Sequence, residues 1–475
     1  MQVSACHPQH IANLPKWSRA RAVIGGEDEI KAGDELYLPR LDSQTDEDYK
    51  AYKERACFFN ATGRTLEGFL GLLFRRNPEI KYPNQAASTS NANTLFPQGV
   101  DLAGTSLNVY CKNVALSVLS VGRVGTLVEW DDESSHAFVC RYEAEDIINW
   151  QTIKANGRRM ISLLVLRETV ERNDPGNIFV PIIAVNYRVL MLEKVGTEYK
   201  YVSELWEQVS VGDKTTYSPT TRIVPLRNGK PLPFIPFVFH GPRDSSPDVE
   251  PAPLAHMIPV NLDHYRLDAD YKHGLHFTAL PTPYATGFDK TTDLKIGSNA
   301  AWISDTPGAT AGFLEFKGAG LSSFVEALNR DERLLSVLGS RMLEDTKRVG
   351  ETVEAIELRQ AGENSVLQTL AFSLSASLTL VLRYVSWWEL QTDLESGDVN
   401  VAINSDFTEK GMTSLELTAV VSAWQGNAIS TETMFDLFRK GEILPTGRTD
   451  AEEKELILKT VAKLKGASTI PAPTS

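Results

Sequence analysis

Two helix-forming stretches flank a Gly- and Pro-rich segment in the middle of the chain. They are LAHMIPVNLDHYRLDADYKHGLHFT, residues 254–278, and LSSFVEALNRDERLLSVLGSRML, residues 321–343. The first would form a helix about 38 Å long at 1.5 Å per residue, with a proline in its first turns, where it is tolerated. The second has one apolar stripe and begins at Ser323, with Glu326 completing a capping box. The pair predicts a helix–insert–helix unit.

The insert, residues 279–320, is predicted to be a small β module. Glycines and prolines punctuate it, and strand-like runs occur at 300–303 and 312–316. The insert is too short to offer the two long helices a core. The two long helices therefore have no obvious core partner within residues 279–320.

On the N-terminal side the pattern changes from helical to alternating. Residues 1–35 are weakly patterned, and then helices are expected at 46–55, 66–74 and 107–119. Turn residues separate the strand-like runs that follow, and prolines in the last run indicate an edge strand. These runs are 126–130, 160–167, 178–190, 199–210 and 231–239. The order predicts an α+β fold with an antiparallel or mixed sheet.

On the C-terminal side a charged break at 344–350 precedes the longest expected helix, residues 352–390, with a kink site at Gly362 and Asn364. Residues 364–382 carry no charge, but polar side chains interrupt them on several faces. A membrane span needs roughly 20 predominantly apolar residues, so this helix is predicted to be buried against protein. A strand at 399–403, helices from 412 onward and a flexible tail complete the chain.

Composition limits the classes of function. The 475 residues carry a net charge of −13, which argues against gripping nucleic acid through clustered cations. It does not exclude a wall past which DNA slides. Four cysteines without paired spacing indicate free thiols in a reducing cytoplasm, and the N-terminus has no secretory signal pattern.

Sequence motifs for catalysis and cofactors are missing. We find no phosphate-binding P-loop, no GxGxxG after a strand, no GxSxG and no HExxH. His256, His264, His273 and His276 lie on one expected helix, and the last two share a face, so a metal pair is sterically possible. Because a third ligand is not obvious, we interpret them as solvated or inter-subunit histidines and expect no metal and no cofactor.

Charge near the start of the longest helix has two readings. Glu351, Glu354 and Glu357 recur every three residues, and Lys347 and Arg348 precede them in the charged break. They form either an ordinary solvated helix face or, if several copies surround a channel, an acidic ring beside a basic loop.

These features together resemble the portal family of tailed bacteriophages, the group that carries an otherwise uncharacterised conserved portal domain. The likeness runs from about residue 36 to 445, and the order of its stretches is more specific than any one of them. The stretches are LPR 38–40, YKAYKERA 49–56, RTLEG 64–68, LFRRNP 73–78, PFIPFVF 233–239, PLAHMIPVNLDHYR 253–266, ETVEA 351–355, AISTET 428–433 and LFRKGEI 437–443.

The resemblance implies a division of the chain into the parts of a portal fold. A mixed α/β wing would carry a two-helix stem, a small β-containing clip, a long kinked wing helix and a helical crown, which is short here. The boundaries would be wing 1–253, stem helix 254–278, clip 279–320, stem helix 321–343, tunnel loop 344–350, wing 351–407, and crown with flexible tail 408–475.

The resemblance also implies function and partners. Such proteins form homo-oligomeric rings, in this case a dodecamer of about twelve copies, at the portal vertex of the virion capsid after assembly in the host cytoplasm. They conduct double-stranded DNA non-specifically and are not enzymes. Partners would be the terminase large subunit, the head-to-tail adaptor, and the major capsid and scaffolding proteins, with no membrane. Lys347 and Arg348 would face the DNA in the tunnel loop, and Glu351, Glu354 and Glu357 the channel.

Two other classes compete with this interpretation. Another ring-forming head–tail connector would share the composition but not the helix–insert–helix unit. A DNA-packaging enzyme would need a P-loop or a carboxylate cluster for two metals. The first is missing from the sequence, and Asp131-Asp132-Glu133 is only a turn-like triplet.

Overall fold

The computed structural model describes residues 2–82, 96, 99–155, 157–174, 176–211, 214–279, 282–288, 302–314, 318, 320–339, 353–390, 394, 399–405, 407, 414–441, 443–444 and 448–466. The chain divides into two compact units, Met1–Ser405 and Asp406–Ser475. Helices and antiparallel sheets occupy separate stretches of the first unit, which confirms the predicted α+β class.

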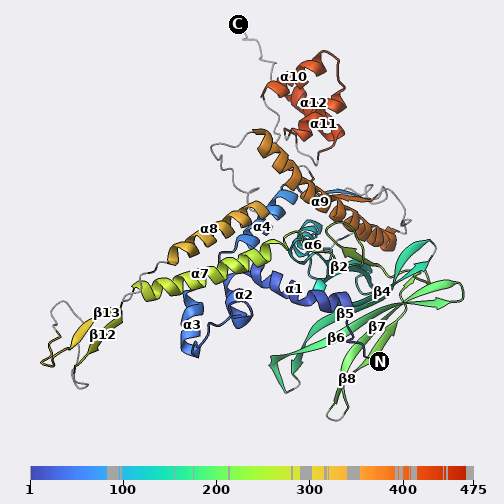
Figure 1. Ribbon diagram of the computed structural model, residues 1–475. Coiled ribbons are helices and arrows are strands. Elements are labelled where there is room, and N and C mark those ends of the chain that lie inside the picture. Colours follow the sequence, from blue (N-terminus) through green and yellow to red (C-terminus); the bar gives the residue numbers. More distant parts are fainter. Residues whose placement is uncertain are drawn as a thin grey trace, which may run out of the picture. The chain divides into compact units, whose positions relative to one another are not determined.

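A layer of helices opens the first unit (Figure 1). Side chains cap three of them, because Thr45, Asn60 and Ser106 each accept a hydrogen bond from a backbone N–H three residues on. The helices are α1 (Pro8–Gly25), α2 (Glu27–Ala32), the short 3-10 turn η1 (Asp34–Leu36), α3 (Asp46–Arg55), α4 (Ala61–Leu73) and α6 (Leu107–Val121). The predicted 46–55 helix has the predicted bounds. The N-terminal stretch is helical although its sequence is weakly patterned. The pattern is weak because α1 buries only a narrow stripe of side chains: His10, Trp17, Ala20 and Val23.

Two antiparallel sheets follow. The smaller has the strand order β11 (Phe237–His240), β2 (Val124–Asp131), β3 (His136–Glu143). β11 is an edge strand, as predicted, but only four residues long. Prolines at 231, 233 and 236 lie just ahead of it, and proline cannot donate a ladder hydrogen bond. A short hairpin of β9 (Leu226–Arg227) and β10 (Lys230–Pro231) precedes it.

The larger sheet is a five-stranded meander. Its strands pair in sequence order: β4 (Ile147–Ala155), β5 (Arg158–Asp174), β6 (Asn177–Val195), β7 (Glu198–Val211) and β8 (Lys214–Ile223). The 3-10 turn η3 (Ala144–Asp146) leads into it. Sequence patterns predicted the middle three strands and missed β4 and β8. In β8 the sequence KTTYSPTTRI has no apolar alternation.

The helix–insert–helix prediction is confirmed, with corrections. α7 (Met257–Ala279) leads to a hairpin of β12 (Thr282–Thr286) and β13 (Thr310–Leu314), and α8 (Leu321–Leu338) returns from it. We call these four elements the helix–hairpin–helix unit. The capping box was wrong: α8 begins at Leu321, after Gly320, without a side-chain cap. Trp302 and Ile303, predicted to form a strand, are not in one, and β12 pairs with β13 instead. Pro283 is tolerated in β12 because each strand of a two-stranded sheet is an edge strand.

α9 (Val353–Leu390) is the longest helix and includes the predicted kink residues. It packs on β11, β2 and β3. Among the described residues, the stretch Val366–Leu390 alone is long and apolar enough to cross a membrane, and 56% of its most apolar window is buried within the fold. The chain then closes on itself through β14 (Asn400–Ala402), which pairs antiparallel with β1 (Glu79–Lys81).

The second unit is helical, as predicted from residue 412 onward. It consists of α10 (Ser414–Gln425), α11 (Thr431–Lys440) and α12 (Asp450–Gly466). The Trp424 indole donates to Thr431 Oγ1 over 3.1 Å, and the Lys454 ammonium lies 2.6 Å from the Glu432 carboxylate. These contacts join α10 to α11 and α11 to α12.

Candidate functional site

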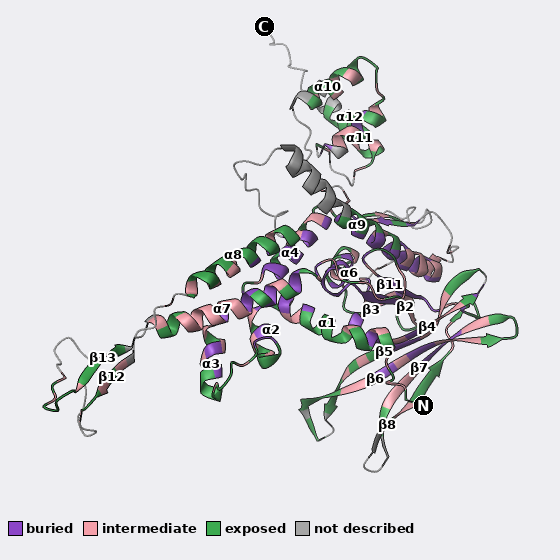
Figure 2. Ribbon diagram, in the orientation of Figure 1, coloured by how far each residue is buried: buried purple, intermediate pink, exposed green. Residues whose placement is uncertain are grey.

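The helix–hairpin–helix unit is anchored at one end. Early in α7, Met257, Leu262, Tyr265 and Ala269 are buried, whereas residues 275–277 are exposed. Figure 2 shows this change along α7, from purple at its start to green near the hairpin. The buried half packs on α1, α3 and α4, so α7 is held by the helical layer and leaves it accompanied by α8.

Glycines allow α7 and α8 to approach closely at both ends. A Cβ on Gly274 of α7 would lie 2.9 Å from Leu321 Cδ2, at the start of α8. At the other end of α8, a Cβ on Gly339 would lie 2.6 Å from Thr65 Cγ2 and 2.7 Å from Met257 Sδ. The two helices therefore run antiparallel in contact along their length.

Polar side chains of α7 fasten it to the N-terminal helices. Asn261 accepts from the Thr62 N–H (3.0 Å) and hydroxyl (2.8 Å). Asp270 accepts from the Tyr52 hydroxyl (2.6 Å), and Asp268 accepts from the Cys57 N–H (2.8 Å). Both carboxylates therefore have structural partners.

The two histidines of that possible pair differ in surroundings. His273 Nδ1 lies 3.3 Å from Arg55 Nη2, and the ring meets Tyr52 edge to face. Burial lowers the pKa of His273, and the Arg55 charge lowers it further, so the neutral ring is an acceptor for the guanidinium. His276 is exposed. Within the described part of the chain, no three His, Cys, Asp or Glu side chains are grouped to hold a metal ion.

A buried carboxylate lies between α7 and α8. Asp331 is 1% exposed, its Oδ1 lies 3.4 Å from the Arg330 guanidinium, and its Oδ2 has no hydrogen-bond partner. Burial raises the pKa of Asp331, and the Asp263 carboxylate raises it further. Beside it, His264 is buried, with Nε2 3.7 Å from Glu332. No sequence pattern indicated this cluster, because Asp331 lies in a run of charged residues typical of a solvated face.

The rest of α8 carries apolar side chains that the described part of the chain leaves exposed. Val325, Leu334, Val337 and Leu338 are each between 40% and 54% exposed. On the hairpin, Tyr284 and Phe313 are about half exposed, and neither strand contains a charged residue. Exposed apolar helices and uncharged strand edges are typical of surfaces that meet another protein.

The predicted DNA-facing residues are not brought into this site. Lys347, Arg348 and Glu351 lie outside the described residues. Glu354 and Glu357 fall in the first turns of α9, a part of the helix in which only the backbone is described. The basic loop and the acidic ring therefore stay predictions.

One histidine meets a serine in the interior. His240 is fully buried, with Nε2 2.7 Å from Thr126 Oγ1 and Nδ1 2.8 Å from Ser377 Oγ. Tyr110 extends the chain through a 2.7 Å bond to Thr126. Among the described residues no carboxylate contacts the imidazole, and Ser377 is buried, so this chain of hydrogen bonds joins α6, β2, β11 and α9 rather than forming a nucleophilic triad. Asp131, the first residue of the acidic triplet, accepts from the backbone N–H of Ser134 in a turn (2.8 Å), as predicted.

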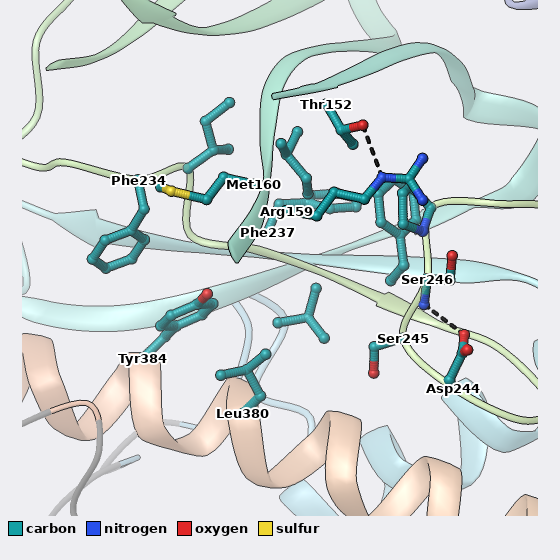
Figure 3. Close-up of a pocket in the computed structure, with 15 residues that line it drawn as sticks. Thr152, Arg159, Met160, Phe234, Phe237, Asp244, Ser245, Ser246, Leu380 and Tyr384 are labelled. Carbon is teal, nitrogen blue, oxygen red and sulfur yellow. Dashed lines mark hydrogen bonds between the residues drawn. The ribbon is translucent and has the colours of Figure 1, made fainter. Parts of the chain in front are cut away.

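A pocket of about 470 Å³ lies between α9, the start of β5 and the segment that leads through β11. Figure 3 shows Phe234, Tyr384 and Leu380 on its apolar side, and Arg159 with Asp244 and Ser246 on its polar side. Arg159 donates to Thr152 Oγ1 over 2.9 Å.

Comparison with known proteins gives one family match. Residues 253–389 match a family described as a domain of unknown function, DUF4055. The matched segment spans the helix–hairpin–helix unit and nearly all of α9. No curated protein matches the chain.

Solved structures that are similar to the chain come from gene transfer agent (GTA) particles. One is from the neck of an empty GTA particle computed with C6 symmetry, with TM-score 0.37, 12% identity, and coverage of 83% of this chain and 91% of that chain. A second is from the neck of a native GTA particle computed with C12 symmetry, with TM-score 0.37, 10% identity, and coverage of 81% of this chain and 91% of that chain. A third is from the virion of a native GTA particle, with TM-score 0.36, 11% identity, and coverage of 88% of this chain and 99% of that chain.

Proposed function

We propose that the chain is the subunit of a phage portal, a closed homomeric ring at one capsid vertex through which double-stranded DNA passes during packaging and ejection. The observation that carries the proposal is the helix–hairpin–helix unit. It is anchored at one end, and α8 exposes Val325, Leu334, Val337 and Leu338, which the rest of the described chain leaves uncovered. Packing against a neighbouring copy would cover this surface, and a repeated heterologous contact gives a ring when the rotation between copies closes.

Charge and sequence resemblance support the same proposal. A net charge of −13 suits a conduit, because a wall rich in clustered cations would hold the phosphates and stall the DNA. The portal-like stretches of sequence occur in order from about residue 36 to 445. In this proposal the protein has no catalytic centre, and the hairpin docks the terminase during packaging and the head-to-tail adaptor later.

The first test is the oligomeric state of the purified chain. Native mass measurement and negative-stain imaging over a range of concentrations should show rings of about twelve copies with a central hole. The pair Leu334→Asp and Val337→Asp should prevent rings, whereas Asn329→Asp, at an exposed polar position of α8, should leave them intact. A monomer at every concentration, even when capsid and scaffolding proteins are co-expressed, would contradict the proposal.

The second test concerns DNA. Reversing charge at Lys347 and Arg348 (K347E, R348E) should leave ring formation unchanged and lower the amount of DNA packaged and retained, because the basic loop would no longer attract phosphates. The matched control is K454E, a cation of α12 that pairs with Glu432. Packaging and retention at the unmodified level in the double variant would remove the tunnel-loop assignment but not the ring.

A further inference from the structure

β5 and β6 continue past the rest of their sheet as a two-stranded arm. β4 pairs with β5 no further than Leu166, and β7 pairs with β6 no further than Tyr187. Residues 167–174 and 177–186, which we call the β5–β6 arm, have ladder partners only in each other among the described residues. A two-stranded ribbon alone in water is at best marginally stable, so a partner surface would stabilise the arm.

The end of the arm is apolar. Phe179 is 87% exposed and Ile183 is 72% exposed. Val180 and Ile182 beside them are each over 40% exposed. Ile182 and Ile183 belong to the regular ladder with β5, whereas Phe179 and Val180 lie at the irregularity just before that ladder begins at Pro181.

The neighbouring β7–β8 ribbon is more polar at the corresponding place, where Val209 and Val211 pair with Thr216 and Lys214, and Ser210 pairs with Thr215. The larger and more exposed apolar cluster of the β5–β6 arm indicates a binding surface.

The pocket beside α9 offers a complementary surface. Met160, Phe234, Leu380 and Tyr384 form its apolar side (Figure 3), and its volume of about 470 Å³ is left unfilled by the chain's own side chains. This volume lies within the roughly 300–1,000 Å³ of ordinary ligand pockets, which is room for large apolar side chains.

Charges flank both surfaces, with opposite signs. Arg159 lines the pocket and pairs with Asp248 of its own chain over 3.1 Å. Its register partner on β4, Lys154, adds a second cation beside the pocket. On the arm, the exposed Glu171 is the register partner of Ile183. Cross-strand partners share a face, so the arm presents an apolar side chain together with a carboxylate, and Lys154 is the cation nearest the pocket that this carboxylate would meet.

The arm cannot fill the pocket of its own chain. Ile161 in the pocket wall and Glu171 beside Ile183 belong to the same strand, ten residues apart. At 3.2–3.4 Å per residue this separation is roughly 32–34 Å. We propose that the β5–β6 arm of one subunit inserts Phe179 and Ile183 into the pocket of its neighbour. This inference rests on the proposed ring, whose head-to-tail contact needs two different complementary surfaces on each copy.

Cysteine cross-linking between subunits tests the contact. In a background without the exposed Cys57 (C57S), I183C subunits are co-assembled with S245C subunits, Ser245 being a pocket residue. Mild oxidation should give covalent dimers in the mixture and none from either variant alone. T216C, on the β7–β8 ribbon, replaces I183C as the control and should give none with S245C.

A charge exchange provides a second readout. Glu171→Lys should raise the concentration at which half the chains are assembled by about tenfold or more, and adding Lys154→Glu should restore much of that loss. Rings that form without the I183C–S245C cross-link and with no effect of E171K would overturn the arm contact and leave the portal proposal standing. Chains that remain monomeric at every concentration would overturn both.

Discussion

His240 is the most deeply placed titratable group of the hydrogen-bond chain that joins the small sheet to α9. Burial lowers the pKa of its imidazole to about 3, and its partners Thr126 and Ser377 lie 114 and 137 residues away in the sequence. No local pattern could have predicted this contact, because a histidine in an apolar edge strand has many possible surroundings.

The depressed pKa of His240 predicts how stability depends on pH. Below pH 6.5 the unfolded chain binds a proton on this imidazole while the folded chain does not, so the free energy of unfolding falls as pH decreases from 6.5 toward 3. At pH 5 the loss is about 2 kcal/mol. Urea unfolding at pH 7.5 and 5 should show a smaller difference for His240→Gln than for the unmodified chain. If the free energy of unfolding changed between the two pH values by the same amount in both proteins, the lowered pKa of His240 would be contradicted.

Asp331 has a pKa shifted the opposite way from that of His240. Because burial raises its pKa, ionisation above pH 3.8 favours the unfolded chain, and this cost grows until the folded carboxyl also ionises. Asp331→Asn should therefore stabilise the protein at pH 8 by on the order of 1 kcal/mol and have little effect below pH 3.8. Glu332→Gln, at the exposed neighbouring position, serves as control and should change stability by less than about 0.5 kcal/mol.

The glycines that flank α8, Gly320 and Gly339, differ in the space available for a side chain. A side chain at Gly339 would collide with the buried Thr65 and with Met257, whereas nothing lies within 4 Å of a Cβ at Gly320. Gly339→Val should lower the free energy of unfolding by about 1–3 kcal/mol, and Gly320→Ala should be nearly neutral. Thermal unfolding of both variants tests this difference, and similar melting temperatures would show that α8 does not dock at Gly339 as described.

Elements with strong local signals could be predicted from sequence, and those fixed by distant partners could not. α3 has its predicted bounds because an acidic first turn and a basic last turn mark both ends. β12 was missed because its ladder partner is more than twenty residues away across the insert. The unpaired α8 surface was expected from the apolar stripe, but the Asp331 cluster depends on how α7 and α8 face each other.

The division of the whole chain into two compact units predicts which truncations are tolerated. A chain ending at Ser405 should keep the unfolding transition of the first unit, because the division falls there. A chain ending at residue 398 loses the buried Val399, Val401 and Ile403 together with the partner of β1. It should be about 4.5–9 kcal/mol less stable, at roughly 1.5–3 kcal/mol for each of the three buried side chains. Urea titrations followed by tryptophan fluorescence would compare them, and equal midpoints would contradict this role of β14.

For the proposed ring, the sequence was enough to suggest the function but not to locate the surfaces through which the subunits would meet. The order of the helices and the insert indicated a portal-like subunit, whereas the β5–β6 arm and the pocket required the strand register. Apart from the α9 wall of the pocket, both surfaces lie in the stretch that sequence described only as short strands and a proline-rich run. The register shows that β5 carries a pocket wall near its start and an apolar cluster beside its end.

Because β1 pairs with β14, the first unit cannot be completed until most of the chain has been synthesised. β1 leaves the ribosome long before β14, since residues 82–399 lie between them. At roughly 5–20 residues per second, translation of that interval takes on the order of 15–60 s. The β5–β6 arm and then α8 are synthesised within this interval, so both are present before the strand that completes the first unit. Exposed apolar surfaces of a nascent chain favour aggregation, so association between unfinished copies competes with folding until β14 has been made.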